Sequence, residues 1–531
     1  MFVAAEIKKN TYYDSVYLMR ITKEIEKTEG VIDVLVGMGT ELNKELVSSL
    51  SMMTKEIESL GPNDFFVVAK IKREEIMGVV TKKIDSLMNE KKKNNVKEHS
   101  PATLDSALKY NPEINFALIS LPGEYAIEEA KKALEKNLHV MLFSDNISVE
   151  KEIELKLFAK QKGLLMMGPD CGTAIINGIP LAFANEVSRG NIGIISASGT
   201  GAQEVSVLID KLGSGISQLI GTGGRDLKDE IGGITMIQAI EALEKDENTK
   251  IIVLISKPPS ENVAEKIFKM LNNSKKNYVV NFIGSESKNV SNSKTHFAYS
   301  LEETAKMAVE LANKSTVRNK EVDAKCKKAI EELKAKEKEA IASAKNMVGN
   351  LSVQRKYMRG LFTGGTLALE AMNILRGRGM EVYSNLAGDE RFILSNANDS
   401  YRNACVDLGD DVFTRGRPHP MIEPSIRNER LIKEIRDEDV LVILMDCVLG
   451  YGSHENPAGE IANTLNLAKK DMTNEENDSP IIVVSIIGTN KDPQNLKESI
   501  IDLENAGAIV VFSTAQATRI VAEITKSIGE C

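Results

Sequence analysis

Residues 192–201 read Ile-Gly-Ile-Ile-Ser-Ala-Ser-Gly-Thr-Gly, and residues 360–369 read Gly-Leu-Phe-Thr-Gly-Gly-Thr-Leu-Ala-Leu. In each stretch an apolar run typical of a buried strand leads through a Gly-rich turn into a helical pattern. Such a junction exposes unpaired backbone N–H groups at the positive end of the helix dipole, which suits a phosphate or a carboxylate. Two junctions in matching contexts can therefore hold one anion from both sides.

The pattern around these two stretches predicts the fold class. From Asn115 onwards strand and helix patterns alternate, which indicates α/β domains with doubly wound parallel sheets. The first part of the chain, with strands at 31–36 and 65–69, reads instead as a small α+β unit. Residues 317–348 are rich in Lys, Glu and Ala without Gly or Pro, as in a long solvated helix. The predicted domains are an α+β unit at 1–95, α/β domains at 100–185, 186–316 and 351–531, and a helical connector at 317–350.

The second and third α/β domains share the same order of parts, which indicates an internal repeat. Residues 198–200 correspond to 364–366, and the Gly-rich acidic loop at 221–226 corresponds to the loop at 407–411. The spacing differs because the third domain carries additional residues, near 388–401 and at 472–478. The repeat is therefore one of structure and not a close duplication.

Composition excludes several classes of function. The net charge is −9, with basic residues scattered through Glu-rich helices, so no footprint for nucleic acid or an anionic membrane is present. The five cysteines are far apart and form no CxxC pair, which argues against disulfides and a zinc site and for a reducing, cytoplasmic location. The amino terminus has no leader pattern, and no apolar run approaches the roughly 20 residues of a membrane span. No Walker A sequence or complete GxGxxG motif occurs.

Ligands of open parallel sheets bind at the carboxyl ends of the strands, so the loops there hold the candidate site. The two Gly-rich turns lie there. In a single such turn, however, glycine can be needed only because the backbone has a positive φ or packs closely. The expected phosphate-binding residues are Ser198, Gly199, Thr200, Gly201, Thr363, Gly364, Gly365 and Thr366.

Two further loops carry catalytic candidates. Arg415 or Arg417 could bind a carboxylate or phosphate, and His419 could act as an acid or base. The alternative for this loop is a solvated segment with local salt bridges. His454 and Asn456 follow another buried strand, in a sequence whose Gly, Asn and Pro are also ordinary turn residues.

Other loops at strand ends supply substrate-binding candidates. Cys171 shows no partner in the sequence that would activate its thiol, so a packing or lining role is expected. His296 is a lone histidine before a helix, for which a surface or capping role is the default. The expected substrate-binding residues are Asp170, Cys171, Gly223, Gly224, Arg225, Gly409 and Asp410, and no metal site is expected.

The order of motifs resembles succinyl-CoA synthetase. Its alpha subunit has a Gly-Pro-Asn-Cys turn, seen here as Gly-Pro-Asp-Cys at 168–171, and a Ser-Gly-Thr helix start, seen here at 198–200. The chain from Arg359 onwards is similar to the CoA-ligase domain of the beta subunit. A fusion of both parts, with Gly-Leu-Phe-Thr-Gly-Gly-Thr at 360–366, resembles the FdrA family over essentially the whole chain. The resemblance implies a Rossmann-like domain at 100–185 and two flavodoxin-like CoA-ligase domains, at 186–316 and 351–531.

The chain departs from succinyl-CoA synthetase at the relay that handles phosphate. The connector leaves no room for an ATP-grasp domain, and the phosphohistidine motif Gly-His-Ala-Gly has become Thr-His-Phe-Ala at 295–298. The supporting Gly-Glu-Ile-Gly-Gly has become Ser-Lys-Pro-Pro-Ser at 256–260. A phosphohistidine at His296 is therefore not expected, although CoA binding stays open.

The FdrA resemblance implies a cytoplasmic subunit of a carbamoyltransferase in allantoin and purine degradation. Oxalurate and phosphate would exchange with oxamate and carbamoyl phosphate, with companion subunits in a hetero-oligomer or further copies of the chain as partners. The two turns would bind phosphate or carbamoyl phosphate, and Arg415, Arg417 and His419 would bind the carboxylated acceptor. The alternative is an acyl-CoA synthetase subunit that forms thioesters through an acyl phosphate, and a third is a ligand-sensing or scaffold subunit.

Overall fold

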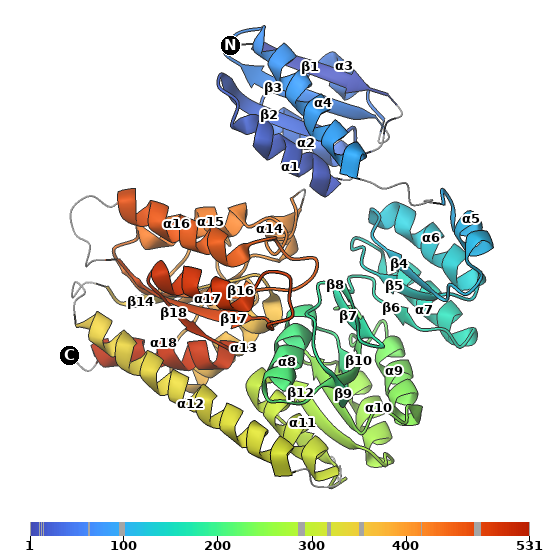
Figure 1. The fold of residues 1–531 in the computed structure, drawn as a ribbon, viewed down its shortest axis with the longest axis vertical. Coiled ribbons are helices and arrows are strands. Elements are labelled where there is room, and N and C mark those ends of the chain that lie inside the picture. Colours follow the sequence, from blue (N-terminus) through green and yellow to red (C-terminus); the bar gives the residue numbers. More distant parts are fainter. Residues whose placement is uncertain are drawn as a thin grey trace. The chain divides into compact units, whose positions relative to one another are not determined.

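The computed structural model describes residues 2–529, apart from 10, 12, 14, 62–63, 95–100, 285–291, 316–319, 350–354, 416 and 472–478. Figure 1 shows the α/β fold with several parallel sheets that the alternating pattern predicts, which confirms the fold class. The chain divides into two compact units, Met1–Glu113 with Arg415–Pro418, and Ile114–Thr414 with His419–Cys531. The additional residues expected at 472–478 lie outside the described part of the chain.

The amino-terminal unit is built around one central strand, β3, whose residues are all buried except Lys70. Phe65 and Val67 face the core under α1 and α4, whereas Phe66 and Val68 pack on the opposite face with residues of α2 and α3. Both faces are covered because the strand is apolar at consecutive positions. The antiparallel order is β1-β3-β2, and the edge strand β1 is an addition to the predicted elements. The elements are β1 Phe2–Lys8, α1 Ser15–Glu26, β2 Val31–Met38, α2 Glu41–Ser49, α3 Lys55–Glu58, β3 Phe65–Ile71 and α4 Ile76–Asn94.

A small parallel sheet of order β4-β5-β6 opens the second unit. Helices α6 and α7 form the crossovers, as parallel pairing requires. The helix α5 Leu104–Tyr110 precedes this sheet in the chain. The other elements are β4 Phe116–Ile119, α6 Gly123–Glu135, β5 His139–Leu142, α7 Val149–Gln161 and β6 Met166–Met167.

The first of two larger sheets has the order β13-β12-β11-β9-β10-β7-β8. The hairpin of β7 and β8 lies within the predicted 100–185 domain, yet it extends this sheet through an antiparallel pairing with β10. The strands are β7 Thr173–Ile176, β8 Ile179–Ala182, β9 Arg189–Ser196, β10 Ile216–Gly221, β11 Ile251–Ser256, β12 Asn277–Phe282 and β13 Thr295–Phe297. The helices are α8 Gly199–Lys211, α9 Ile234–Lys245, α10 Glu261–Asn272 and α11 Leu301–Ser315.

The carboxy-terminal sheet has the order β15-β14-β16-β17-β18, all parallel. Its middle strands β16 and β17 are buried at every residue, because helices cover both faces. The strands are β14 Tyr357–Phe362, β15 Ala404–Asp407, β16 Val440–Val448, β17 Ile481–Ile487 and β18 Ala508–Val511. The helices are α13 Gly365–Gly377, α14 Asp411–Thr414, α15 Ser425–Ile435, α16 Pro457–Asp471, α17 Leu496–Asn505 and α18 Thr514–Gly529.

Strand order confirms the internal repeat. Five strands of the first large sheet run β10-β9-β11-β12-β13, and those of the second run β15-β14-β16-β17-β18, so both have the doubly wound order 2-1-3-4-5. In this order the winding direction reverses between strands 1 and 3, and ligands bind outside the carboxyl ends there. The switch points lie between β9 and β11 and between β14 and β16, where the two quoted Gly-rich turns begin.

The predicted connector is the helix α12 Lys320–Val348, which Figure 1 shows in yellow beside α18. One of its faces is buried, through Cys326, Leu333, Ala340 and Ala344, so the helix is not solvated on all sides as expected. Its Glu337 pairs with Arg519 of α18 at 2.6 Å. Among the described residues, no helix combines the length and apolarity that a membrane crossing requires.

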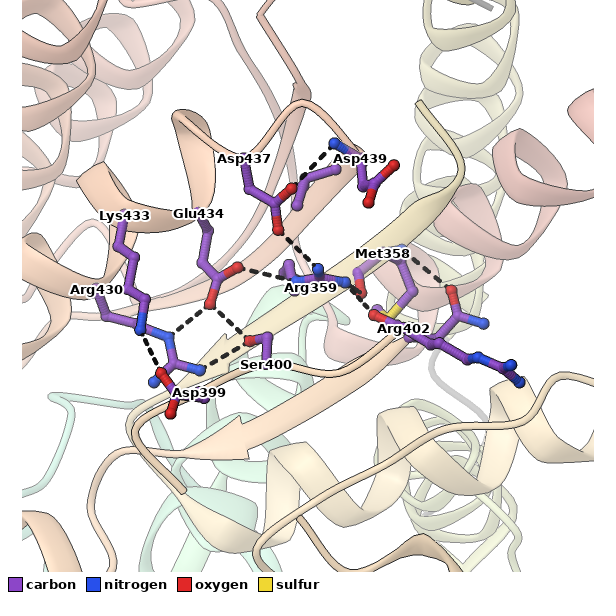
Figure 2. Close-up of polar contacts among 12 residues, drawn as sticks. Met358, Arg359, Asp399, Ser400, Arg402, Arg430, Lys433, Glu434, Asp437 and Asp439 are labelled. Atoms are coloured by element: carbon purple, nitrogen blue, oxygen red, sulfur yellow. Dashed lines mark hydrogen bonds and ion pairs between the residues drawn. The ribbon is translucent and has the colours of Figure 1, made fainter. Parts of the chain in front are cut away.

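Buried charges fix α15 to the first strand of the carboxy-terminal sheet, as Figure 2 shows. Arg359 of β14 donates from Nε to Glu434 Oε2 at 2.9 Å, and Arg430 Nε donates to Glu434 Oε1 at 2.6 Å. Arg359 also pairs with Asp437 at 3.0 Å. Glu434 is 2% exposed, so its carboxylate is the counter-charge for two buried guanidinium groups.

We expect Glu434→Ala to lower the stability of the carboxy-terminal domain by about 3–5 kcal/mol, because it leaves the buried Arg430 without its carboxylate and Arg359 with Asp437 alone. The midpoint of urea unfolding, followed by the loss of α/β circular dichroism, measures this effect. The neighbouring Lys433→Ala removes an exposed pair with Asp399 and should cost less than about 1 kcal/mol. Equal effects of both variants would contradict the role given to Glu434.

Candidate functional site

The two Gly-rich turns are in direct contact. Ser198 Oγ donates to Thr366 Oγ1 at 2.6 Å, although the residues are 168 positions apart in sequence. Gly364 lies against Thr200, and a Cβ at position 364 would be 2.5 Å from Thr200 Cγ2. The helices α8 and α13 therefore begin side by side, as the repeat predicts.

Hydroxyl groups of the turns are used to shape them. Ser198 is the N-cap of α8 and accepts from Gly201 N at 3.0 Å. Thr363 donates from its backbone N–H and its hydroxyl to the Asp446 carboxylate at the end of β16. Since Thr366 already accepts from Ser198, the hydroxyls of Ser198 and Thr363 and the Thr366 acceptor are committed within the protein. We assign the side chains of these three residues, and Gly201, to positioning the turns and not to direct ligand contact.

Two reciprocal carboxylate contacts, one turn further along α8 and α13, join the two halves of the repeat. Glu204 of α8 accepts from Thr514 N and Oγ1 at the start of α18, in the other half of the repeat. Glu370 of α13 accepts in turn from Leu301 N at the start of α11. Burial raises the pKa of Glu370 to about 7 and that of Glu204 well above its ordinary value. Each half of the repeat thus caps a helix of the other.

Where α8 and α13 begin, several backbone N–H groups have no hydrogen-bond partner among the described residues. The N–H groups of Gly199 and Thr200 in α8, and of Gly364, Gly365 and Thr366 in α13, make no hydrogen bond within the described part of the chain. Gly199 is exposed, and Thr200 and Gly365 are partly exposed. Unsatisfied N–H groups at two helix termini attract an anion, by about 0.3–2 kcal/mol for each dipole.

Two charged side chains flank the start of α13. Asp407 Oδ2 and Lys257 Nζ lie 2.6 Å and 3.2 Å from the position a Cβ of Gly365 would take. Asp407 ends β15, and Lys257 follows β11, so each comes from the carboxyl end of a strand next to a switch point. Neither was a predicted site residue. The signal for Lys257 was its place in the motif that departs from succinyl-CoA synthetase, and the signal for Asp407 was its place at a strand end.

The pKa of Asp407 is raised to about 7. Burial is the main cause, and Asp410 and Asp446 add to it, whereas the Gly409 N–H and Lys257 oppose it. Gly409 N donates to Asp407 Oδ1 at 3.0 Å, which leaves Oδ2 without a hydrogen bond among the described residues. Asp407 is thus a carboxyl with one anchored and one free oxygen that titrates near neutral pH.

His419 lies beside Asp407. Its ring packs on Phe183 with centroids 5.7 Å apart, and its Nε2 is 2.6 Å from the position a Cβ of Gly409 would take. Met421 N donates to His419 Nδ1 at 3.2 Å, so in neutral histidine the proton is on Nε2, which becomes a donor. Burial, with a smaller effect of Arg427, lowers the pKa of His419 to about 4. At neutral pH His419 is therefore an uncharged hydrogen-bond donor.

Asp170 contributes a second carboxyl near the turns. Loss of hydration raises its pKa to about 6, with Asp145 and Asp411 adding to this and Arg225 and Lys257 opposing it. Its turn packs on the 221–226 loop, where Gly223 and Gly224 lie against Pro169 and Asp170. Arg225 donates to Ile147 O at 2.7 Å and pairs with Glu152, so the guanidinium braces the loop.

The remaining predicted residues have structural surroundings. Cys171 is buried, and burial raises the pKa of its thiol to about 12, which suits packing and not nucleophilic attack. His454 Nδ1 accepts from Asn456 N, and Asn456 Oδ1 accepts from Gly459 N as the cap of α16. Asp410 Oδ1 accepts from Val412 N at the start of α14. These side chains stabilise turns and helix starts.

Three predicted residues are not among the groups that contact the turns. Arg415 and Arg417 are exposed and belong to the segment that groups with the amino-terminal unit. His296 lies inside the edge strand β13, level with Val279 of β12. None of the three is among the groups placed around Gly365.

Comparison with known proteins agrees with this architecture. The family model for a CoA-binding domain matches residues 187–284, that for a CoA-ligase domain matches 361–524, and that for the AllF heavy metal-associated domain matches 1–103. Both halves of the repeat therefore match models of domains that occur in succinyl-CoA synthetase-like proteins. The chain belongs to the same family as YahF of Escherichia coli, with which it is 44% identical over 514 residues, 97% of either chain.

More distant relatives cover single parts of the chain. A succinate–CoA ligase (ADP-forming) alpha subunit of Archaeoglobus fulgidus is 28% identical over 147 residues, which are 27% of this chain and half of that protein. Among solved structures, the dinucleotide-forming acetyl-coenzyme A synthetase 1 of Ca. Korarchaeum cryptofilum is 13% identical with a TM-score of 0.32, over 79% of this chain and 84% of that one.

The amino-terminal unit does not fit the metal chemistry in the name of its family model. Soft metals in small domains of this kind are held by thiolates, and residues 1–103 contain no cysteine. Within the described ranges, His, Cys, Asp and Glu side chains form no group of three that could hold a metal ion. No role of the protein is therefore assigned to a metal in this unit.

We expect Gly364→Ala to destabilise the protein because its methyl group would overlap Thr200 and separate the two turns. The Thr200→Gly change removes that overlap, so the double variant should recover part of the loss, as a positive coupling in a double-mutant cycle. Gly377→Ala in the same helix is the control, because no atom lies within 4 Å of its Cβ position. Thermal midpoints are measured for wild type and the four variants, and a Gly364→Ala midpoint equal to that of Gly377→Ala would refute the close contact.

The raised pKa of Asp407 predicts a pH-dependent stability. Between pH 4 and 7 the folded state holds a proton on Asp407 that the unfolded state releases, so wild-type stability falls as pH rises through this window. Asp407→Asn removes this pH-dependent loss of stability. The difference in thermal midpoint between Asp407→Asn and wild type should therefore increase from pH 4 and become constant above pH 7. Asp411→Asn, which neutralises an exposed carboxylate of the same loop, should show no such trend. A constant difference between Asp407→Asn and wild type would contradict the raised pKa.

Proposed function

We propose that the chain binds the phosphoryl group of an acyl phosphate between the starts of α8 and α13 and transfers the acyl group to the thiol of CoA, as an acyl-CoA ligase subunit. One observation carries the proposal: five N–H groups without a partner among the described residues belong to two touching helix termini, and the Lys257 ammonium group lies beside one of these termini. Dianionic phosphate is the common metabolite group that such an arrangement suits best.

The chemistry requires stabilisation of a leaving phosphate. As the acyl carbon bonds to sulfur, the bond to the phosphate oxygen breaks and negative charge builds up on the phosphate. Fixed N–H donors and the Lys257 ammonium stabilise this charge without reorganisation. His419 can donate from Nε2 to an oxygen of the same ligand, because its neutral form is the stable one at pH 7.

CoA as acceptor is supported by the family models. The CoA-binding model matches 187–284 and the CoA-ligase model matches 361–524, so both halves of the repeat are similar to domains that handle CoA. The relatives that match the first half include succinate–CoA ligase alpha subunits. These findings favour a thioester product over other acyl transfers.

A second candidate is the carbamoyl transfer between oxamate and carbamoyl phosphate that the FdrA resemblance implies, in a complex with companion subunits. The position of His296 agrees with either candidate, because both start from a preformed acyl phosphate. His296 is level with Val279, Val253 and Ile194 on successive strands, so it lies three strand spacings from β9, about 14 Å. A phosphohistidine relay would need His296 at the turns, and direct use of a preformed acyl phosphate such as carbamoyl phosphate avoids that relay.

Calorimetric titration of the full-length chain with acetyl phosphate, carbamoyl phosphate and inorganic phosphate tests the shared part of both candidates. Gly365→Asp adds a carboxylate at the start of α13 and should weaken binding of all three at least tenfold, or by about 1.4 kcal/mol. Gly377→Asp, at the open end of the same helix, should bind as wild type does. No binding by wild type, or equal binding by both variants, would overturn the proposed phosphate site.

Two product assays then separate the candidates. Thioester formed from acetyl phosphate and CoA supports the ligase, whereas oxalurate formed from carbamoyl phosphate and oxamate supports the transferase. The assays are run with the chain alone and with its companion subunits.

A further inference from the structure

Among the described residues, Asp407 has one anchored and one free carboxylate oxygen on a side chain whose backbone is held in place. Its backbone is held by Asn385, which accepts from Asp407 N at 3.0 Å and donates to Asp407 O at 3.1 Å. Gly409 N holds Oδ1, so Oδ2 alone stays available and lies next to Gly365. Asp446 is committed to Thr363, and Asp410 caps α14.

A comparison of the two halves of the repeat shows that only the second half has a carboxylate at this position. Asp407 pairs with Phe362, the last residue of β14, three positions before α13 begins. The register of the first half puts Gly221 opposite Ser196, three positions before α8 begins. At Gly221 a Cβ would collide with Cys171 and lie 2.5 Å from Thr173 O, so no side chain fits there. The first half of the repeat therefore presents only backbone N–H donors at its turn. The second half presents N–H donors and the Asp407 carboxylate.

The surroundings of Asp407 supply a positive charge and a neutral hydrogen-bond donor. Lys257 is the cation beside it, and His419 Nε2 and Asp407 Oδ1 lie 2.6 Å and 3.2 Å from the same point, the Cβ position of Gly409. The carboxylates of Asp410 and Asp446 are the other charges that act on it. A phosphoryl group bound at α13 would place its acyl carbon and the incoming nucleophile within reach of Oδ2.

We propose that Asp407 is the general base of acyl transfer, a catalytic residue at the site of the proposed function, on which this inference rests. Oδ2 takes the proton from the attacking thiol or amide as its sulfur or nitrogen bonds to the acyl carbon. The carbon–oxygen bond to phosphate breaks, and the proton passes from Asp407 to the departing phosphate. A carboxyl that titrates at about pH 7 matches the protonation state that this exchange needs at neutral pH.

The test uses the full-length chain and the variants Asp407→Asn and Asp411→Asn. Asp407→Asn should reduce acyl transfer to CoA or oxamate, whichever wild type uses, by 100-fold or more, about the contribution of a general base. Transfer from acetyl phosphate to hydroxylamine, whose nitrogen is already a free nucleophile at pH 7, should fall much less. Asp411→Asn should retain wild-type rates with both acceptors. Equal losses with both acceptors, or no loss with either, would overturn the assignment.

Anion binding gives an independent readout that needs no turnover. Sulfate keeps its charge between pH 6 and 8, so its affinity for wild type should rise as pH falls through about 7, when Asp407 gains a proton. Asp407→Asn should bind sulfate at least as tightly as wild type and without this pH dependence. A wild-type affinity that is constant with pH would overturn the proposal for Asp407. Absence of sulfate and phosphate binding altogether would instead defeat the phosphate site itself.

Discussion

The contact between the first turns of α8 and α13 is the constraint on which the candidate site depends. Thr200 takes the space where residue 364 would have a side chain, and Ser198 donates to Thr366 across the same contact. The reciprocal caps of Glu204 on α18 and Glu370 on α11 fix the two halves of the repeat in one relative orientation. Both turns lie at topological switch points, where ligands of open parallel sheets bind. The contact between the turns therefore combines two such ligand positions into one.

The two halves of the repeat have different residues at the same register position. Opposite the end of β9 stands Gly221, packed against Cys171, while opposite the end of β14 stands Asp407 with a free oxygen. The same asymmetry holds for the residue that shapes each turn, which is the Ser198 hydroxyl in the first half and the Asp446 carboxylate in the second. In the proposed function both halves therefore donate hydrogen bonds to the phosphate, and the second half alone supplies the base.

The sequence predicts the sheets and the meeting of the turns better than it predicts the side chains around them. Apolar strand patterns and Gly-rich turns are local signals, and their repetition implies a pseudo-symmetric contact. Polar residues at strand ends are ambiguous: His454 and Asn456 have the same signal as Lys257 and Asp407, yet they cap α16. Only the proximity of Lys257 and Asp407 to Gly365 at the start of α13 separates the two cases. The edge strand β1 was missed because its charged and small residues are not typical of a core strand.

Acidic residues around an anion site require an explanation of how the anion is tolerated. Asp407 and Asp170 have pKa values raised to about 7 and about 6, so at neutral pH they carry less charge than their formal count implies. The buried Glu370, also raised to about 7, lies under the same helix start. A phosphate dianion raises these values further, because like charges disfavour ionisation. The Lys257 ammonium group opposes this rise at Asp407 and favours the ionised form, which can accept the proton of the nucleophile.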